Sequence, residues 1–437
     1  MRKVKLLLVF LSFSITVFAD GVFDYGFYLR LRQECVENVF DFNKANIMRD
    51  DNYFRLKASV WGKWNFSDDV NMFVKLTTEP KYYLSTTGQM SGGKELKDQE
   101  IFFDNLYLDV KNAFGMPVDL RLGRQDFLMT HGEGFLIMDG TPSDGGRSLY
   151  FNAAKATLRF DEKNSLDIIY TQNTYQDEYL PLINDQDRNI IYPKMDERAV
   201  ILYGKFKVDD NLSVEPYYIH KTEDAHTRAG NYIEKLKLNT VGNRAVYNFA
   251  PWSLRGELAY QFGEYDDNRD RSGLGGYIFL KRAFTEAKLS PTLDIGYAYL
   301  SGDGNPYAGD KDKGWNPLFS KWPWLSELYV FHSVIERNEV GYWTNLQIWR
   351  AKTDMKITDK TGFCLAYNYL RANDNPAPAV FFGTGKERGH LGQVQLFHKF
   401  NKNIDGLMLL EYFKPGNFYA SDRDNALFFR WQLQMNF

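Results

Sequence analysis

The segment Asn425-Ala-Leu-Phe-Phe-Arg-Trp-Gln-Leu-Gln-Met-Asn-Phe437 decides the fold of this chain. From Leu427 to Phe437 every second residue is apolar, and from Arg430 onward polar residues separate them. Because a β-strand directs alternate side chains to opposite faces, the segment has one apolar and one polar face. A final strand of this kind, closing on an aromatic residue, is typical of an outer-membrane β-barrel. The alternative is an edge strand of a soluble sandwich.

The amino terminus predicts export. Arg2, Lys3 and Lys5 precede a largely apolar run from residue 6 to 18, and Val17-Phe-Ala19 offers a small-residue cleavage site. This is the pattern of a secretory signal peptide, and an apolar run of this length is too short to span a bilayer. We expect residues 1–19 to be the signal peptide and residues 20–437 to form a single transmembrane β-barrel domain.

The composition agrees with a barrel. Aromatic residues make up 16% of the chain, which suits the aromatic girdles of a barrel in a membrane. Mean hydropathy is −0.44, and after residue 19 no apolar run is long enough for a transmembrane helix. The formal net charge of −3 argues against a nucleic-acid partner. Cys35 and Cys364 are too few for a disulfide framework, and we expect two free thiols.

Alternation of apolar and polar residues predicts an all-β, antiparallel, up-and-down membrane barrel of about 18 strands. The expected strands lie at 21–34, 52–64, 70–84, 99–111, 117–127, 149–160, 165–177, 196–208, 212–224, 233–248, 251–264, 274–286, 290–301, 340–357, 362–371, 388–400, 405–414 and 425–437.

The lengths of the connections support this topology. Links from even-numbered to odd-numbered strands are short, whereas most of the others are long and reach 38 residues between 302 and 339. Short periplasmic turns and long extracellular loops are the pattern of outer-membrane barrels. Barrels of about 16 to 18 strands leave a water-filled channel, so transport is the leading function.

Cationic residues recur on the polar faces of the expected strands. An arginine facing lipid at mid-depth would cost about 2–4 kcal/mol, so we expect these residues to face the pore. Rings of Arg or Lys select anions, and Arg pairs well with carboxylates. The expected pore residues are Arg30, Arg32, Arg55, Lys57, Arg121, Arg159, Arg255 and Arg430. Acidic residues share these faces, so the alternative is a neutral wall in which the charges pair across strands.

Several segments resemble the alginate export family of outer-membrane channels. They are the hairpin from Asn105 to Asp126 with Arg121-Leu-Gly-Arg-Gln125, Asp144-Gly-Gly-Arg-Ser-Leu149, Ser301-Gly-Asp-Gly-Asn305, Asn316-Pro-Leu-Phe319, Trp324-Leu-Ser-Glu-Leu-Tyr329, Glu387-Arg-Gly-His-Leu391 and Glu411-Tyr-Phe-Lys-Pro-Gly416. Together they run from about the fourth expected strand to the carboxyl terminus.

The resemblance implies an 18-stranded barrel whose Arg-lined, electropositive constriction passes an anionic uronate polymer. On this chain it places Arg121 and Arg124 on the matched hairpin, Arg147 on the following loop and Arg430 on the last strand. Arg124 falls on the same side of the expected strand as the apolar residues Leu120 and Leu122. Either a bulge or the end of the strand must therefore turn its side chain toward the pore, or Arg124 lies at the rim of the barrel. Members of so broad a family need not all carry alginate.

The leading hypothesis is therefore an outer-membrane channel for an acidic, alginate-like polysaccharide or oligosaccharide. A general or small-anion uptake porin is the alternative, and a structural or adhesive barrel without transport is a different class. We expect no enzyme activity, cofactor or metal. The expected partners are the lipid bilayer, lipopolysaccharide, the anionic saccharide and periplasmic polysaccharide-secretion proteins, in the outer membrane of a Gram-negative-type bacterium.

Three loop features leave alternatives open. Asp303 to Asp312 is rich in oxygen ligands but lacks EF-hand spacing, so a solvated loop is favoured over a Ca²⁺ site. His131 could pair with Ser143 or Ser148, yet no nucleophile elbow marks either serine. The apolar tracts 127–138 and 377–382 either fold inward as plugs or gates, or cap the barrel.

Overall fold

The computed structural model describes most of the chain. The described residues are 22–39, 41–45, 50–84, 94, 96–97, 99–127, 129–138, 150–184, 195–228, 231–304, 309–320, 324–328, 343–375 and 382–437. The expected signal peptide, Ser143, Arg147, Ser148 and the tract 377–381 lie outside them.

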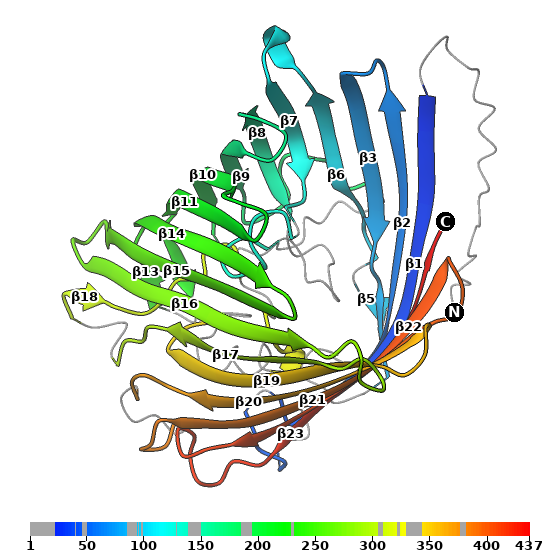
Figure 1. Ribbon diagram of the computed structural model, residues 1–437. Coiled ribbons are helices and arrows are strands. Elements are labelled where there is room, and N and C mark those ends of the chain that lie inside the picture. Colours follow the sequence, from blue (N-terminus) through cyan, green and yellow to red (C-terminus); the bar gives the residue numbers. More distant parts are fainter. Residues whose placement is uncertain are drawn as a thin grey trace, which may run out of the picture.

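Eighteen antiparallel strands pair in sequence order, and the last pairs with the first to close a barrel (Figure 1). The predicted fold class is confirmed. The barrel strands are β1 (Val22–Glu37), β2 (Asp51–Asn65), β3 (Val70–Thr78), β6 (Ile101–Val110), β7 (Val118–Gln125), β8 (Phe151–Arg159), β9 (Ser165–Asn173), β10 (Glu197–Lys207), β11 (Leu212–Glu223), β14 (Leu236–Phe249), β15 (Trp252–Tyr265), β16 (Asp270–Ala283), β17 (Thr292–Leu300), β19 (Leu346–Lys356), β20 (Thr361–Arg371), β21 (Glu387–Lys399), β22 (Ile404–Pro415) and β23 (Ala426–Asn436).

Several short strands lie in the loops, and a 3₁₀ turn lies in one of the short connections. They are β4 (Lys81–Tyr83), β5 (Leu96–Lys97), β12 (His226–Arg228), β13 (Asn231–Ile233), β18 (Lys311–Asp312) and a 3₁₀ turn at Ala113–Gly115. No helix in the described part of the chain is long and apolar enough to cross a bilayer.

Strand bounds differ from the expectation where local chemistry intervenes. The predicted strand 70–84 is divided, because β3 ends at Thr78, before Glu79-Pro80, and the short β4 follows. Proline has no backbone N–H to give to the sheet, which explains the break. The predicted strand 274–286 is β16, which begins four residues earlier, at Asp270.

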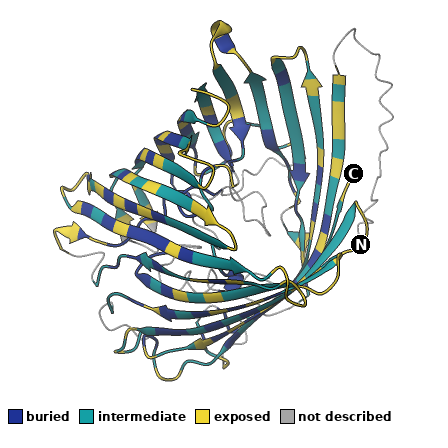
Figure 2. Ribbon diagram, in the orientation of Figure 1, coloured by how far each residue is buried: buried dark blue, intermediate teal, exposed yellow. Residues whose placement is uncertain are grey.

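The parity of the final strand sets the two sides of the wall. Arg430 and Gln432 on β23 are buried on the inner side, and Arg430 lies opposite Glu34 of β1. Trp431 points outward, where its indole nitrogen donates to Gln33 Oε1 at 2.9 Å. Figure 2 shows the same alternation of burial along the other strands. On β23, Arg430 therefore lies on the inner side of the wall and Trp431 on the outer side.

The short turns at one end share a local design. Asp161 Oδ1 accepts the backbone N–H groups of Lys163 and Asn164 at 2.7 and 2.8 Å. Hydrogen bonds, first that from the Asn164 side chain, hold the pKa of Asp161 below its usual value. Asp209 caps the next such turn in the same way. These side chains explain why the links are so short, because each closes a turn within its own few residues.

Candidate functional site

Two long loops fold into the barrel. The first inner loop, residues 126–127 and 129–138, follows β7, and the second inner loop, residues 309–320 and 324–328, precedes β19. Both contribute to the buried apolar cluster inside the barrel, which includes Phe127, Phe135 and Leu136 of the first loop and Trp315 and Phe319 of the second. Of the two alternatives for the tract 127–138, the structure shows the inward fold.

The first inner loop reaches from β7 to a distant part of the wall. His131 Nε2 lies 2.9 Å from Asp167 Oδ2 on β9, and burial lowers the pKa of His131 to about 4. Farther along, Glu133 accepts hydrogen bonds from the Tyr277 hydroxyl at 2.7 Å and from Arg255 Nε at 3.0 Å. The loop therefore extends along the inside of the wall from β7 to β16.

The second inner loop is held at one end by β11 and β15. Buried Lys221 on β11 donates to the Leu318 carbonyl at 3.0 Å and pairs with Glu197 and Glu223. Gln261 on β15 exchanges two hydrogen bonds with the backbone of Asn316, at 2.7 and 2.9 Å. Lys221 has no exposed surface, and it donates to two carboxylates and one carbonyl oxygen. It therefore holds this part of the loop firmly.

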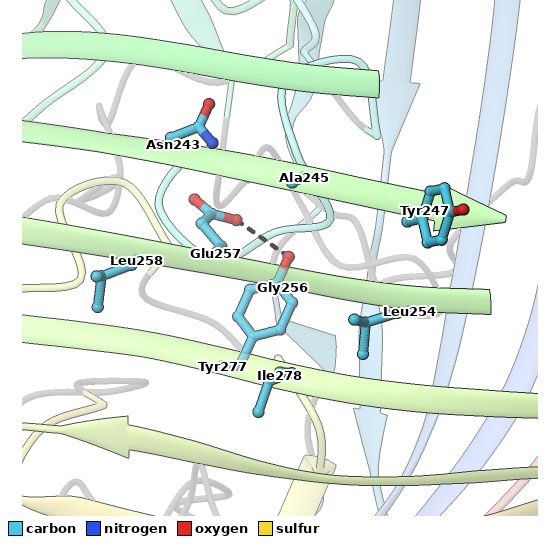
Figure 3. Close-up of a pocket in the computed structure, with 9 residues that line it drawn as sticks. All are labelled: Asn243, Ala245, Tyr247, Leu254, Gly256, Glu257, Leu258, Tyr277 and Ile278. Atoms are coloured by element: carbon cyan, nitrogen blue, oxygen red, sulfur yellow. Dashed lines mark hydrogen bonds between the residues drawn. The ribbon is translucent and has the colours of Figure 1, made fainter. Parts of the chain in front are cut away.

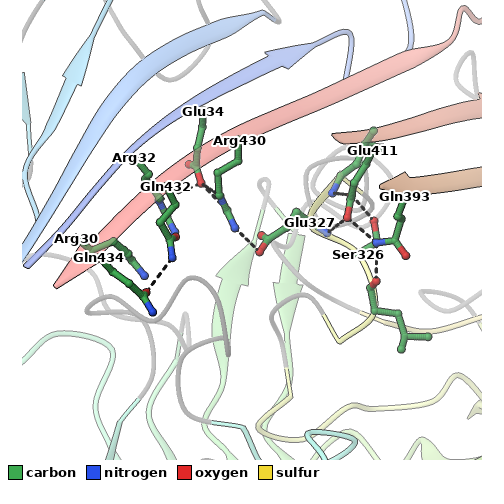
Figure 4. Close-up of polar contacts among 12 residues, drawn as sticks. Arg30, Arg32, Glu34, Ser326, Glu327, Gln393, Glu411, Arg430, Gln432 and Gln434 are labelled. Atoms are coloured by element: carbon green, nitrogen blue, oxygen red, sulfur yellow. Dashed lines mark hydrogen bonds and ion pairs between the residues drawn. The ribbon is translucent and has the colours of Figure 1, made fainter. Parts of the chain in front are cut away.

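The other end of the second inner loop is held by β22 and β23 (Figure 4). Arg430 Nη1 donates to Glu327 at 2.8 Å, while Glu411 accepts the Ser326 hydroxyl at 2.8 Å and the Leu328 N–H at 2.7 Å. Counted around the barrel, β11 is the ninth strand and β23 the eighteenth. The described parts of the loop therefore contact opposite sides of the wall.

The two inner loops also bind each other. The Phe319 N–H donates to the Leu136 carbonyl at 3.0 Å, and the Ser320 hydroxyl donates to the Gly134 carbonyl. The Phe135 ring lies between the rings of Trp315 and Trp324, with centroids 5.2 and 5.3 Å away. Together the loops form a partition inside the barrel, so they shape the solute path as much as the strands do.

Five of the nine predicted pore cations are buried. Arg124 forms two hydrogen bonds to Asp177, at 2.6 and 2.8 Å, at the end of β7. The other four lie on the inner face: Arg430, which pairs with both Glu34 and Glu327, Arg30, which pairs with Glu79, Arg32, which pairs with Glu34, and Lys57. A solute reaches these five only if the surrounding side chains move.

The other four predicted cations keep exposed surface inside the barrel. Their side chains are 11% exposed for Arg55, 30% for Arg121, 37% for Arg159 and 23% for Arg255. Each has a carboxylate partner, namely Glu79, Asp109, Asp119 and Glu133, at 2.6 to 3.2 Å. Partly exposed arginines of this kind can offer hydrogen bonds to a passing anion without leaving the wall.

Sequence reasoning missed further inward cations. Arg244, Lys205 and Lys352 lie on the inner face, with side chains 14%, 33% and 32% exposed. Segments 233–248 and 340–357 alternate poorly, which hid Arg244 and Lys352. Lys205 shares the parity of buried Ala199 and Ile201, and that signal could have found it.

The inner wall has two faces of different charge. On the face made by β1 to β10, Arg30 and Arg55 both contact the carboxylate of Glu79, and Lys155 forms no ion pair with any described residue. We call this the basic face. On β11 to β17, the cations Arg244 and Arg255 stand among four carboxylates, which are Glu133, Glu215, Glu257 and Asp294.

Arg124 is buried at the end of β7 although it keeps the parity of Leu122. It lies across the sheet from Asn152, to which its Nε donates at 2.9 Å, and Asn152 stands between Phe151 and Ala153 of the inner cluster. Its guanidinium is covered by the Tyr150 ring and by Asp177. Gly123, beside it, has φ of 124°, and an added Cβ would lie 2.2 Å from the Leu106 carbonyl oxygen, so only glycine fits.

A recess of about 300 Å³ over β14 to β16 belongs to the outer surface (Figure 3). It lies where Gly256 has no side chain, and it is bordered by outward-facing Leu254, Leu258 and Ile278. Glu257 and Tyr277 mark the inner side of the same strands, where they hydrogen-bond to each other at 3.1 Å. The recess faces the membrane and is no part of the solute path.

The described residues contain no group of three or more His, Cys, Asp or Glu side chains arranged for a metal ion. In the oxygen-rich loop, Asp312 is bound by Arg271 and by the Tyr265 hydroxyl. Cys35 and Cys364 are free thiols, as expected.

The alginate export family model matches residues 23–432. Among solved structures, OccAB1 of Acinetobacter baumannii is similar with a TM-score of 0.60 at 12% identity, covering 95% of this chain and 96% of that one. OccK2 (OpdF) of Pseudomonas aeruginosa, solved in complex with glucuronate, gives a TM-score of 0.58 at 9% identity, covering 95% and 97%. The search of curated proteins finds no match.

Proposed function

The chain belongs to the alginate export family, and on that basis we propose that it is an outer-membrane channel for acidic, uronate-type oligosaccharides or polysaccharides. Export and uptake use the same pore, since a pore has no direction of its own. Periplasmic polysaccharide-secretion proteins are the partners we expect if the solute is exported.

The charge of the basic face carries this proposal. Arg30 and Arg55 both contact Glu79, and Lys155 lies directly across from Arg121 on the neighbouring strand, with no ion pair to a described residue. Arg55, Arg121 and Lys155 therefore place a succession of cations along this face. Several exposed cations in succession bind each carboxylate of a chain weakly, which lets the chain advance.

Charge reversal tests the proposal. Replacing Arg55 and Arg121 by Glu is expected to reverse or abolish the anion preference of single channels in planar bilayers, because both side chains keep some exposed surface inside the barrel. The matched control is Arg198→Glu. Arg198 is the second residue of β10 and points to the outside of the barrel, so this change should not alter the charge that faces the pore. Cation selectivity of the unmodified protein, with no block by oligouronates, would refute the proposed function.

A small-anion uptake porin is the second candidate, and the partition favours it. The two inner loops occupy part of the lumen and bind each other, which narrows the path for a polymer. Liposome swelling separates the candidates: entry of glucuronate with exclusion of uronate oligomers would favour the small-anion porin. A structural barrel would show no conductance even after deletion of the inner loops.

A further inference from the structure

Glu133 lies on a loop, yet it contacts the wall as a bound anion would. Its carboxylate accepts hydrogen bonds from the Tyr277 hydroxyl at 2.7 Å and Arg255 Nε at 3.0 Å, and Arg244 Nε lies 3.6 Å away. It stands between two glycines with φ of 76° and 85°, and its side chain is 21% exposed. This carboxylate is therefore held inside the barrel at the border of the open space.

The two arginines do not depend on Glu133 for their positions. Arg244 Nη1 binds Glu215 at 2.7 Å, and Arg255 Nη2 binds Asp294 at 2.8 Å. Both partners are wall residues on barrel strands, Glu215 on β11 and Asp294 on β17. The arginines consequently keep their orientation when Glu133 moves away, which leaves a preformed site for another carboxylate.

The site also has a hydrogen-bond donor that Glu133 does not satisfy. Arg244 Nε is buried and has no hydrogen-bond acceptor among the described residues, because Glu133 is 3.6 Å away. A carboxylate free of the loop could approach this donor and Arg255 together. A carboxylate that hydrogen-bonds to both Arg244 Nε and Arg255 would therefore fit this site better than the carboxylate of Glu133 does.

We propose that Arg244, Arg255 and Tyr277 form a binding subsite for the carboxylate of a uronic acid, and that Glu133 occupies this subsite in the resting channel. The subsite rests on the proposed function, since it names where one sugar carboxylate binds. A tethered group competes at an effective concentration in the millimolar range, so solute carboxylates must displace Glu133. Displacement frees the middle of the first inner loop from the wall.

The test measures block of the channel current by glucuronate in planar bilayers. Glu133→Gln removes the competing charge and keeps the side-chain size, so the glucuronate concentration for half-block is expected to fall at least tenfold. Glu133→Asp keeps the charge on a shorter side chain and is expected to lie between the two. Glu162→Gln, in an exposed short turn, is the matched control and should leave the value unchanged.

A second variant tests the location of the subsite. Adding Arg255→Gln to Glu133→Gln should return half-block to at least the unmodified concentration, because the principal donor is gone. An equal glucuronate concentration for half-block in Glu133→Gln and unmodified channels, or a gain that survives Arg255→Gln, would overturn the subsite. Either result leaves the proposed function intact if uronate oligomers still block. Cation selectivity with no block in any variant would instead refute the proposed function.

Discussion

Gly123 shows how the close approach of a neighbouring strand fixes one residue. Its φ is 124°, and an added Cβ would lie 2.2 Å from the Leu106 carbonyl oxygen. Gly123→Ala is expected to lower the free energy of unfolding by about 1–3 kcal/mol or more, since it adds a clash to a conformation that alanine disfavours. Urea unfolding, followed by the heat-dependent gel migration of the barrel, measures the change.

Gly392→Ala is the control for that substitution. Gly392 also lies in a barrel strand, but an added Cβ meets no atom within 4 Å there. Its unfolding midpoint should match that of the unmodified protein. Equal destabilisation by both substitutions would mean that the loss of glycine itself, and not the clash with Leu106, explains the effect.

His131 predicts how the first inner loop responds to pH. Burial lowers its pKa to about 4, against 6.5 for an exposed histidine. A depressed pKa means that the anchored state is fully stable above about pH 6.5 and loses stability as the pH falls toward 4. Conductance is therefore expected to rise between pH 6.5 and 4 as the loop detaches. His131→Asn should remove most of that rise, and an unchanged pH profile would contradict the prediction.

At the scale of elements, strands were predictable and the loop contacts were not. Alternation and turn chemistry act within a few neighbouring residues, so the sequence predicts most strands to within a few positions. The largest differences are six residues, at the end of β3 and the start of β19. The contact between Glu133 and Arg255 joins residues 122 positions apart, and no local pattern indicates it. The apolar content of the tract 127–138 indicated burial, but both an inward plug and an external cap would bury it.

The second inner loop gives a prediction at this scale. Glu327→Gln weakens its contact with Arg430, which keeps Glu34 as a partner, so the barrel should still close. We expect open-channel conductance to rise at least twofold, because the loop end is less firmly held. Single-channel recording measures this conductance. Glu264→Gln, on the outer surface, is the control, and a similar rise in that variant would show that the loop contact is not the cause.

At the scale of the whole molecule, the sequence predicts which side of the wall a charged residue faces, but it does not predict the partner in its ion pair. The polar face of β1 and β2 predicts that Arg30 and Arg55 point inward, and they do. The sequence does not show that both share Glu79, or that Arg32 is sealed against Glu34, because every acid on an inner face is an equal candidate partner. The pathway is thus a product of the closed barrel and not of any one strand.

The second inner loop, fixed to β11 at one end and to β23 at the other, also has a mechanical consequence. Because the loop is bound to opposite sides of the barrel, a change in the cross-section of the barrel is expected to move the loop, and a movement of the loop to change the cross-section. We therefore expect any flattening of the barrel to strain the Lys221 and Arg430 contacts, so that lateral pressure in the bilayer reaches a loop inside the lumen.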